Sequence, residues 1–361
     1  MSSELIISQS PGNTPIKKIP RDYFPEGCGF WFIIPEGLDA NKKMFFRDSK
    51  HGSDNPENTI LFVHGNPENS YTYRKVIMHI IEQVKKPYRL VAIDHIGFGL
   101  SDQATYEMVC MDHASNLIQM VKYLDLRNIT LVIHDWGGPI GIGALLKEPE
   151  RLKNLVILNT TVFPLPPSGI TYKNFPGKWL YWARGPKIIP NRFWGAFAAF
   201  AIFAKPMKIT KLFIKMFFSI LTNTIGIFKK NERVAQKLFK RQFKSKLNVL
   251  SSKRLVLQTP MWGYGNNYFE PQLGNRDTSD FYQFIQDNIS NLWGVNGQNV
   301  GVRLLCGKWD PLAKNEVIKQ WLINLPQIAS HVKIFEKIGH FIEEIKPKEI
   351  ANDIITVAGL V

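Results

Sequence analysis

The chain contains few cysteines, no long hydrophobic run and no basic N-terminus. Only three cysteines occur among 361 residues, and no two of them form a CxxC pair. This argues against a disulfide framework and against a zinc site. No apolar stretch approaches the roughly 20 residues that span a bilayer, and Glu4 stands where a secretory signal carries basic residues. We therefore expect a cytoplasmic protein in a reducing compartment.

Acidic residues are scarce in one part of the chain only. Between Phe163 and Val300 there are twenty Lys and Arg but five Asp and Glu, whereas the rest of the chain holds twenty-five of each. The whole net charge of +15 therefore arises in this central stretch. A basic stretch raises nucleic acid as a partner. Because its aromatic residues are interleaved with aliphatic ones and no recognised binding module occurs, we expect no nucleic acid partner.

Short apolar runs alternate with helical segments over residues 58–160 and again after residue 299. This alternation predicts an α/β core, a mostly parallel sheet with helices on both faces. The stretch between lacks the alternation and is rich in Trp, Phe and Lys, which predicts an insertion and not a second sheet domain. We expect a loosely organised arm (1–27), a core (28–162 and 299–361) and a helical, basic cap domain (163–298).

The individual elements follow from the same patterns. The expected strands are 28–35, 43–47, 59–63, 88–93, 130–132, 154–159, 300–306 and 332–335. The expected core helices are 70–84, 108–124, 136–146, 315–325 and 341–357.

The most informative segment is Ile133–Gly138, where an apolar run meets a polar residue and then two glycines. This pattern predicts a strand, a very tight turn and the start of a helix. In the Gly-x-Ser-x-Gly form of such a nucleophile elbow, a serine is held outward at the top of the sheet. Asp135 occupies the position of that serine, so the predicted nucleophile is a carboxylate.

Two further residues complete a catalytic triad with Asp135. Asp310 and His340 each follow a predicted strand, and the order nucleophile, acid, histidine is that of α/β-hydrolases. Asp310 would accept the imidazole N–H, and His340 would activate a water. Alone, each is an ordinary turn, cap or loop residue, but their joint position at strand ends favours the triad. Asp94 and His134 have no partner in this scheme and are interpreted as structural.

A carboxylate nucleophile also requires donors for the leaving group. The indole N–H of Trp136 and the side-chain amide of Asn66 offer them, and the backbone N–H groups of both residues would form an oxyanion hole. Core packing of Trp136 and an Asx turn at Asn66 are the structural alternatives. The scheme requires no cofactor and no metal ion.

Four motifs together resemble the haloalkane dehalogenases of the α/β-hydrolase superfamily: His64–Pro67, Asp94–Ser101, His134–Gly138 and Gly339–His340. The resemblance covers about residues 58–160 and 300–357. It implies a lipophilic small-molecule substrate, displacement of halide by Asp135 to form an alkyl-enzyme ester, and hydrolysis of that ester by a His340-activated water.

The same motifs leave other substrates open. Asn66, Trp136 and the late Asp310 resemble the third dehalogenase subfamily, which also contains cis-β-lactone decarboxylases of long-chain olefin biosynthesis. Soluble epoxide hydrolases share the elbow and the triad, but they usually carry Phe at the position of Asn66 and use two cap tyrosines. Candidate tyrosines in this chain are Tyr172, Tyr181, Tyr264 and Tyr268.

The basic cap has competing interpretations. Lys173–Arg254 contains nineteen basic residues and one acid, Glu232. Basic and apolar side chains recur there at helical spacing, including Lys205, Lys208, Lys211, Lys215, Ile209, Leu212, Phe213, Met216 and Phe217. The pattern fits a solvated lid over the pocket, or peripheral contact with an anionic membrane. A catalytically idle hydrolase fold that binds a membrane or a protein partner is the non-enzymatic alternative.

Overall fold

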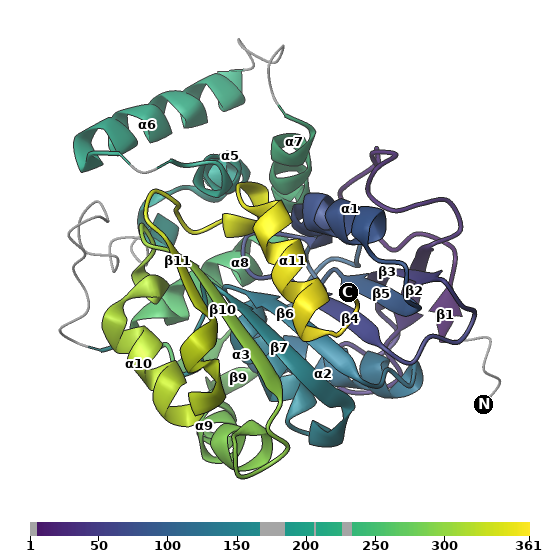
Figure 1. Cartoon of the computed structure of the whole chain (residues 1–361). Coiled ribbons are helices and arrows are strands. Elements are labelled where there is room, and N and C mark those ends of the chain that lie inside the picture. The colour runs from purple at the N-terminus through teal and green to yellow at the C-terminus, as the bar shows by residue number, and fades with distance from the viewer. Residues whose placement is uncertain (1–5, 167–184, 206, 226–232) are drawn as a thin grey trace.

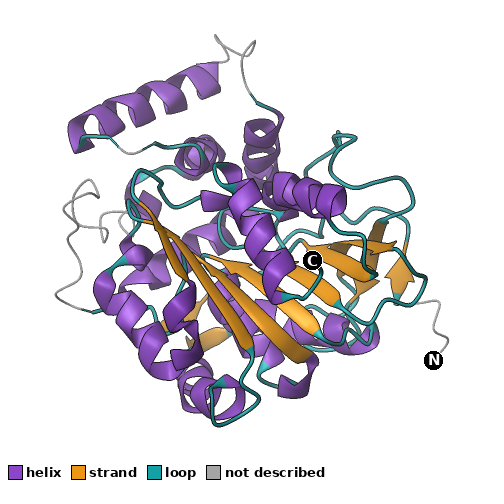
Figure 2. Cartoon of the chain, in the orientation of Figure 1, coloured by secondary structure: helices purple, strands orange, loops and turns teal. Residues whose placement is uncertain are grey.

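A computed structural model describes residues 6–166, 185–205, 207–225 and 233–361. In this part of the chain, nine strands form one sheet in the order β1-β2-β3-β5-β4-β6-β7-β10-β11 (Figures 1 and 2). The strands are β1 (Ile7–Ser8), β2 (Gly29–Ile33), β3 (Lys43–His51), β4 (Thr59–Val63), β5 (Tyr88–Ile93), β6 (Ile129–His134), β7 (Leu152–Leu158), β10 (Gly301–Gly307) and β11 (Val332–Phe335).

The sheet is parallel from β5 to β11, whereas β1, β2 and β3 add antiparallel strands at one edge. Every residue of β4 and β6 is buried, as expected for central strands that are covered on both faces. The carboxyl ends of β6, β7 and β10 therefore lie side by side. The predicted mostly parallel sheet is confirmed.

Helices cover both faces of the sheet. On one face α1 (Arg74–Gln83) packs against α11 (Pro347–Val357), and their apolar side chains share a core with β4 and β5. The other face carries a larger core, to which several helices contribute. Among them are α2 (Cys110–Tyr123), α3 (Gly137–Leu145), α9 (Ser279–Trp293) and α10 (Asn315–Asn324).

Two local predictions are wrong. The expected single helix 341–357 is a short 3-10 turn (Ile342–Glu344) followed by α11, because Pro347 lacks an N–H and begins a new helix. The N-terminal arm is anchored: Ile16 and Tyr23 are buried, and the Tyr23 hydroxyl donates to Asp94.

The segment between β7 and β10 holds α5 (Asn191–Ile202), α6 (Ile209–Ile225), α7 (Val234–Arg241) and α8 (Lys246–Gln258). It also contains a hairpin of β8 (Asn267–Glu270) and β9 (Gly274–Asp277), which the sequence patterns did not predict. Although α9 belongs to the same stretch, it packs against α3. None of the described helices combines the length and apolar character needed to cross a membrane.

Candidate active site

Asp135 lies in the tight turn between β6 and α3, with a positive φ of 49°. This left-handed conformation is uncommon for a residue that has a Cβ. Gly137, two positions later, has no room for a side chain, because a Cβ there would lie 2.3 Å from the carbonyl oxygen of Val63. The predicted elbow is therefore present, with its side chain at the carboxyl end of the sheet.

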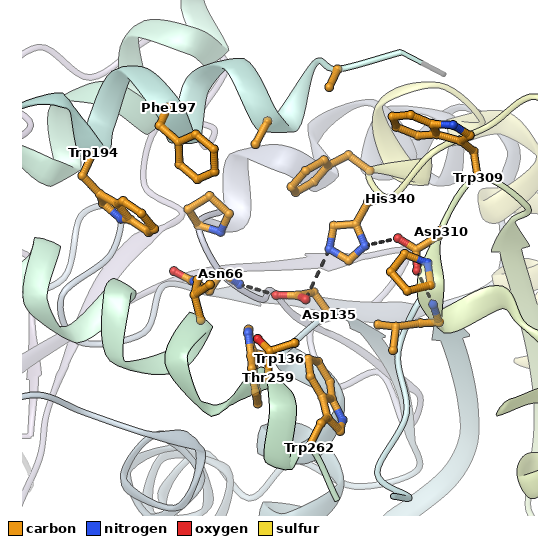
Figure 3. A pocket seen from close by; sticks show the side chains of 17 residues that line it. Asn66, Asp135, Trp136, Trp194, Phe197, Thr259, Trp262, Trp309, Asp310 and His340 are labelled. Carbon is orange, nitrogen blue, oxygen red and sulfur yellow. Dashed lines mark hydrogen bonds and ion pairs between the residues drawn. The ribbon is translucent and has the colours of Figure 1, made fainter. Parts of the chain in front are cut away.

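The structure brings the three predicted catalytic residues together (Figure 3). His340 Nε2 lies 3.2 Å from Asp135 Oδ1, and His340 Nδ1 lies 2.5 Å from Asp310 Oδ2. The other carboxylate oxygen of Asp310 accepts the Leu312 backbone N–H at 2.7 Å. Asp310 is thus held from both oxygens, and the imidazole is oriented between two carboxylates.

The charges around His340 shift its titration. Burial alone would lower the pKa of this imidazole, but Asp310 and Asp135 outweigh burial and hold the pKa well above its usual value. Both neighbouring carboxylates therefore favour the protonated form of His340.

The backbone of Asn66 contacts the nucleophile directly. Its N–H donates to Asp135 Oδ2 at 2.8 Å, so the two oxygens of Asp135 differ: Oδ2 faces this donor, and Oδ1 faces His340. The contact depends on a close approach at Gly65, where a Cβ would lie 2.6 Å from Asp135 Oδ2. The Asn66 N–H therefore lies against the carboxylate of Asp135.

The Asn66 side chain is fixed by α8 and α5. Ser252 Oγ donates to Asn66 Oδ1 at 2.5 Å, and Trp194 Nε1 donates to Ser252 Oγ at 2.9 Å. Asn66 Nδ2 donates to the Ser252 carbonyl at 3.2 Å with one of its two hydrogens. This relay determines which end of the amide is the donor. Sequence reasoning missed Ser252 and Trp194 because they lie far away in the chain.

Trp136, the second predicted donor, stacks on Trp262 with ring centroids 3.8 Å apart. Trp262 Nε1 donates to the Thr161 carbonyl at 2.7 Å, which fixes the stack. Among the described residues, the Trp136 indole N–H has no hydrogen-bond partner. Trp136 therefore offers an unpaired N–H donor next to Asp135, in a pocket that Trp136 helps to line.

All five predicted site residues line one pocket. Its other walls are mostly apolar, and they come from α5, α8 and the segments after β10 and β11. The additional lining residues are Pro67, Trp194, Phe197, Ala201, Ala204, Val256, Thr259, Trp262, Trp309, Pro311, Leu312 and Phe341. No tyrosine of the described residues is among them. Tyr172 and Tyr181 lie outside the described residues.

A buried cluster lies directly behind His340. His134 Nδ1 contacts Glu68 Oε1, and its Nε2 lies 3.7 Å from Glu343 Oε2. All three side chains are fully buried. Their ligand atoms lie within 4.8 Å of one another, but both ring nitrogens already have hydrogen-bond partners, because Nε2 also donates to the His340 carbonyl. We assign no metal to this cluster.

Asp94 and His134, which were interpreted as structural, are both buried and hydrogen-bonded. Asp94 is buried and accepts hydrogen bonds from Tyr23, Ser70 and Leu100, which fits a structural residue. His134 has partners that sequence reasoning did not find. Glu68 and Glu343 follow the motifs of Asn66 and His340 closely in the sequence but lie outside them.

The chain belongs to the α/β-hydrolase fold family, whose model matches residues 58–347. It is 26% identical over 302 residues to a cis-3-alkyl-4-alkyloxetan-2-one decarboxylase from Shewanella oneidensis, covering 82% of this chain and 80% of that protein. It is 31% identical over 137 residues to a haloalkane dehalogenase from Agrobacterium fabrum, covering 38% and 41% of the two chains.

Solved structures show the same fold. The haloalkane dehalogenase DpaA from Paraglaciecola agarilytica superposes with a TM-score of 0.64 at 20% identity, covering 95% of this chain and 97% of that one. An esterase from Thermogutta terrifontis gives a TM-score of 0.57 at 15% identity, covering 90% and 96%. The chain is therefore an enzyme of the α/β-hydrolase fold that is similar to haloalkane dehalogenases and β-lactone decarboxylases.

Proposed function

We propose that Asp135 is a carboxylate nucleophile that attacks an electrophilic carbon of a lipophilic substrate. The proposal rests on the different surroundings of the two carboxylate oxygens of Asp135. Oδ2 accepts the Asn66 backbone N–H at 2.8 Å, whereas Oδ1 borders the apolar pocket beside His340. Oδ1 forms the bond to carbon, and the indole N–H of Trp136 and the side-chain amide of Asn66 bind the leaving group.

Ester formation then changes the role of His340. The ester of Asp135 is neutral, so one of the two carboxylates that raise the pKa of His340 is lost. The pKa of His340 then falls, and the neutral imidazole, oriented by Asp310, acts as a general base that accepts a proton from water. The water that it activates attacks the carboxyl carbon of Asp135, and the negative charge develops on the oxygen beside Asn66 N–H.

The substrate that we favour is a cis-3,4-dialkyl β-lactone. The supporting observation is the breadth of the match to the decarboxylase from Shewanella oneidensis, which spans 82% of this chain. The match to the dehalogenase from Agrobacterium fabrum spans 38%. A haloalkane is the second candidate, supported by the free Trp136 donor in the pocket.

The two candidates differ in their second step. With a β-lactone, attack at the ring carbon that bears oxygen breaks its C–O bond and leaves a carboxylate on the neighbouring carbon. Loss of CO₂ moves the electron pair of the C–C bond into a new C=C bond, and the ester C–O bond breaks to restore Asp135. This route yields an alkene and CO₂ without water, whereas a haloalkane requires the water that His340 activates.

A parallel assay tests the proposal. The full chain is incubated with 1-bromoalkanes, a long-chain cis-β-lactone and an epoxide, with halide, CO₂ and diol as readouts. Asp135→Asn is expected to abolish turnover, whereas Asp287→Asn, at an exposed acid of α9, is expected to retain it. His340→Gln with a bromoalkane is expected to add the mass of the alkyl group to the protein.

Several outcomes would contradict this scheme. Turnover by Asp135→Asn would remove Asp135 as the nucleophile. Diol formation from the epoxide alone would support the epoxide alternative, for which no described tyrosine lines the pocket. Absence of turnover and of any adduct on all three substrates would favour the non-enzymatic alternative.

We also infer that the protein contacts anionic membranes peripherally. The support is the concentration of positive charge in the cap, with nineteen basic residues and one acid between Lys173 and Arg254. Lipophilic substrates accumulate in bilayers, so contact with a bilayer would supply the pocket. Sedimentation with vesicles at low and high salt tests this contact, which is expected to weaken as salt screens the charges.

A further inference from the structure

Helix α6 packs on the molecule through one row of side chains. Leu212 is buried, and Met216 and Ile220, at successive positions four residues on, pack against the main core. The helix lies against the outer side of α5 (Figure 1). This single row of side chains, one per helical turn, therefore provides the packing contacts of α6 with the rest of the protein.

Two further apolar rows on α6 face solvent. Large side chains in these rows expose between 40% and 63% of their surface. They follow the same spacing of four residues, so they run along the helix beside the packed row. They are Phe213, Phe217 and Leu221 in one row and Ile214 and Phe218 in the other. A surface this apolar is unusual unless it meets another apolar phase.

Basic residues border the exposed rows. Lys211 and Lys215, again four residues apart, are exposed, and Lys208 stands just before the helix. Ile209–Ile225 contains no Asp or Glu. An exposed apolar face flanked by lysines, with no acid, fits the interface of an anionic bilayer, where rings enter the acyl boundary and ammonium groups meet lipid phosphates.

We propose that α6 is the element that inserts into the surface of an anionic membrane, with Phe217 and Phe218 at the centre of the contact. Charge favours an anionic membrane over a second copy of this chain, because a second copy would bring another positively charged cap toward these lysines. The helix lies parallel to the membrane plane, and its packed row holds it to α5.

The position of α5 links this surface to the pocket. Trp194, Phe197 and Ala201 of α5 line the pocket, while α6 packs on the same helix. A membrane bound to α6 is therefore one helix away from the substrate site. This link to substrate supply rests on the proposed function, whereas the assignment of the membrane contact to α6 rests on the exposed side chains of that helix.

The test measures binding of the full chain to vesicles of phosphatidylcholine, with and without phosphatidylglycerol. The double variant Phe217→Ser/Phe218→Ser is expected to bind the anionic vesicles roughly tenfold more weakly or worse. Lys211→Glu/Lys215→Glu is expected to lose the dependence on phosphatidylglycerol. The matched control is Lys319→Glu/Ile323→Ser on α10, which alters an exposed lysine and an exposed apolar residue elsewhere.

Each outcome bears on the proposal. Unchanged vesicle binding by Phe217→Ser/Phe218→Ser, or equal binding to vesicles without phosphatidylglycerol, would overturn it. So would dissociation of an oligomer by that variant in the absence of lipid, which would assign the surface to a second copy. Asp135→Asn is expected to bind vesicles normally, so failure of the chemistry and failure of the membrane contact are distinguishable.

Discussion

His134 Nε2 donates to the backbone carbonyl of His340 at 2.9 Å. A carbonyl oxygen only accepts, so Nε2 carries a proton in every state in which this bond exists. The other ring nitrogen contacts the buried carboxylate of Glu68. The loop that carries His340 is therefore held by the imidazole of His134, which in turn contacts the carboxylate of Glu68.

Removing Glu68 is expected to destabilise the fold. Glu68→Leu leaves His134 Nδ1 buried without its partner, and loss of one member of a buried pair typically lowers the free energy of unfolding by about 3–5 kcal/mol. Urea denaturation followed by circular dichroism measures this change. Glu57→Leu, at an exposed position, is the control and is expected to change stability by less than about 0.5 kcal/mol. Equal stability of the two variants would contradict a structural pair.

Stability is expected to fall as pH rises from about 6.5 to about 9. Burial lowers the pKa of His134, but Glu343 and Glu68 outweigh it and raise the pKa to about 9. A raised folded-state pKa gives stability that is complete below the unfolded value near 6.5 and is lost as pH passes the folded value. Burial also raises the pKa of Glu343, which acts in the same direction. His134→Gln should flatten the profile between these limits; an unchanged profile would disprove the assignment.

Loss of Ser252 is expected to impair the leaving-group step. Ser252→Ala removes the hydroxyl that donates to Asn66 Oδ1, so the amide is free to present its oxygen to the pocket. We expect a fall of roughly tenfold in kcat, of the order of one lost oriented donor. Ser251→Ala is the neighbouring control; its hydroxyl accepts the Met108 N–H and does not contact Asn66. A larger loss for Ser251→Ala would contradict this role.

Added volume at Gly65 is expected to displace the nucleophile. The Cβ of Gly65→Ala would lie 2.6 Å from both Asp135 Cβ and Oδ2, closer than real contacts allow. We expect at least a hundredfold loss of turnover, because small displacements of reacting groups reduce rates on this order. Gly185→Ala, whose Cβ would meet neighbours at ordinary distances of 3.7 Å and beyond, is expected to retain activity. Equal activity of both variants would show that Asp135 tolerates the shift.

The sheet, the elbow and the placement of the site residues were predictable because each has a local signal. Buried strands are short apolar runs, and Asp135, Asp310 and His340 follow three of them directly. Ser252 and Glu343 were not predictable in the same way, because their contacts join residues 186 and more than 200 positions apart. The helical spacing on α6 was visible in the sequence, but only the structure separates its packed row from its exposed rows.

The pairing of β7 with β10 has a consequence for synthesis of the chain. These neighbouring strands are joined by residues 159–300, so the growing polypeptide presents β7 without this partner until β10 (Gly301–Gly307) has also left the ribosome. Until then β7 is an open sheet edge, which is prone to misassociation. Asp135 also emerges long before Asp310 and His340, so the nascent chain carries the proposed nucleophile well before it acquires the proposed base.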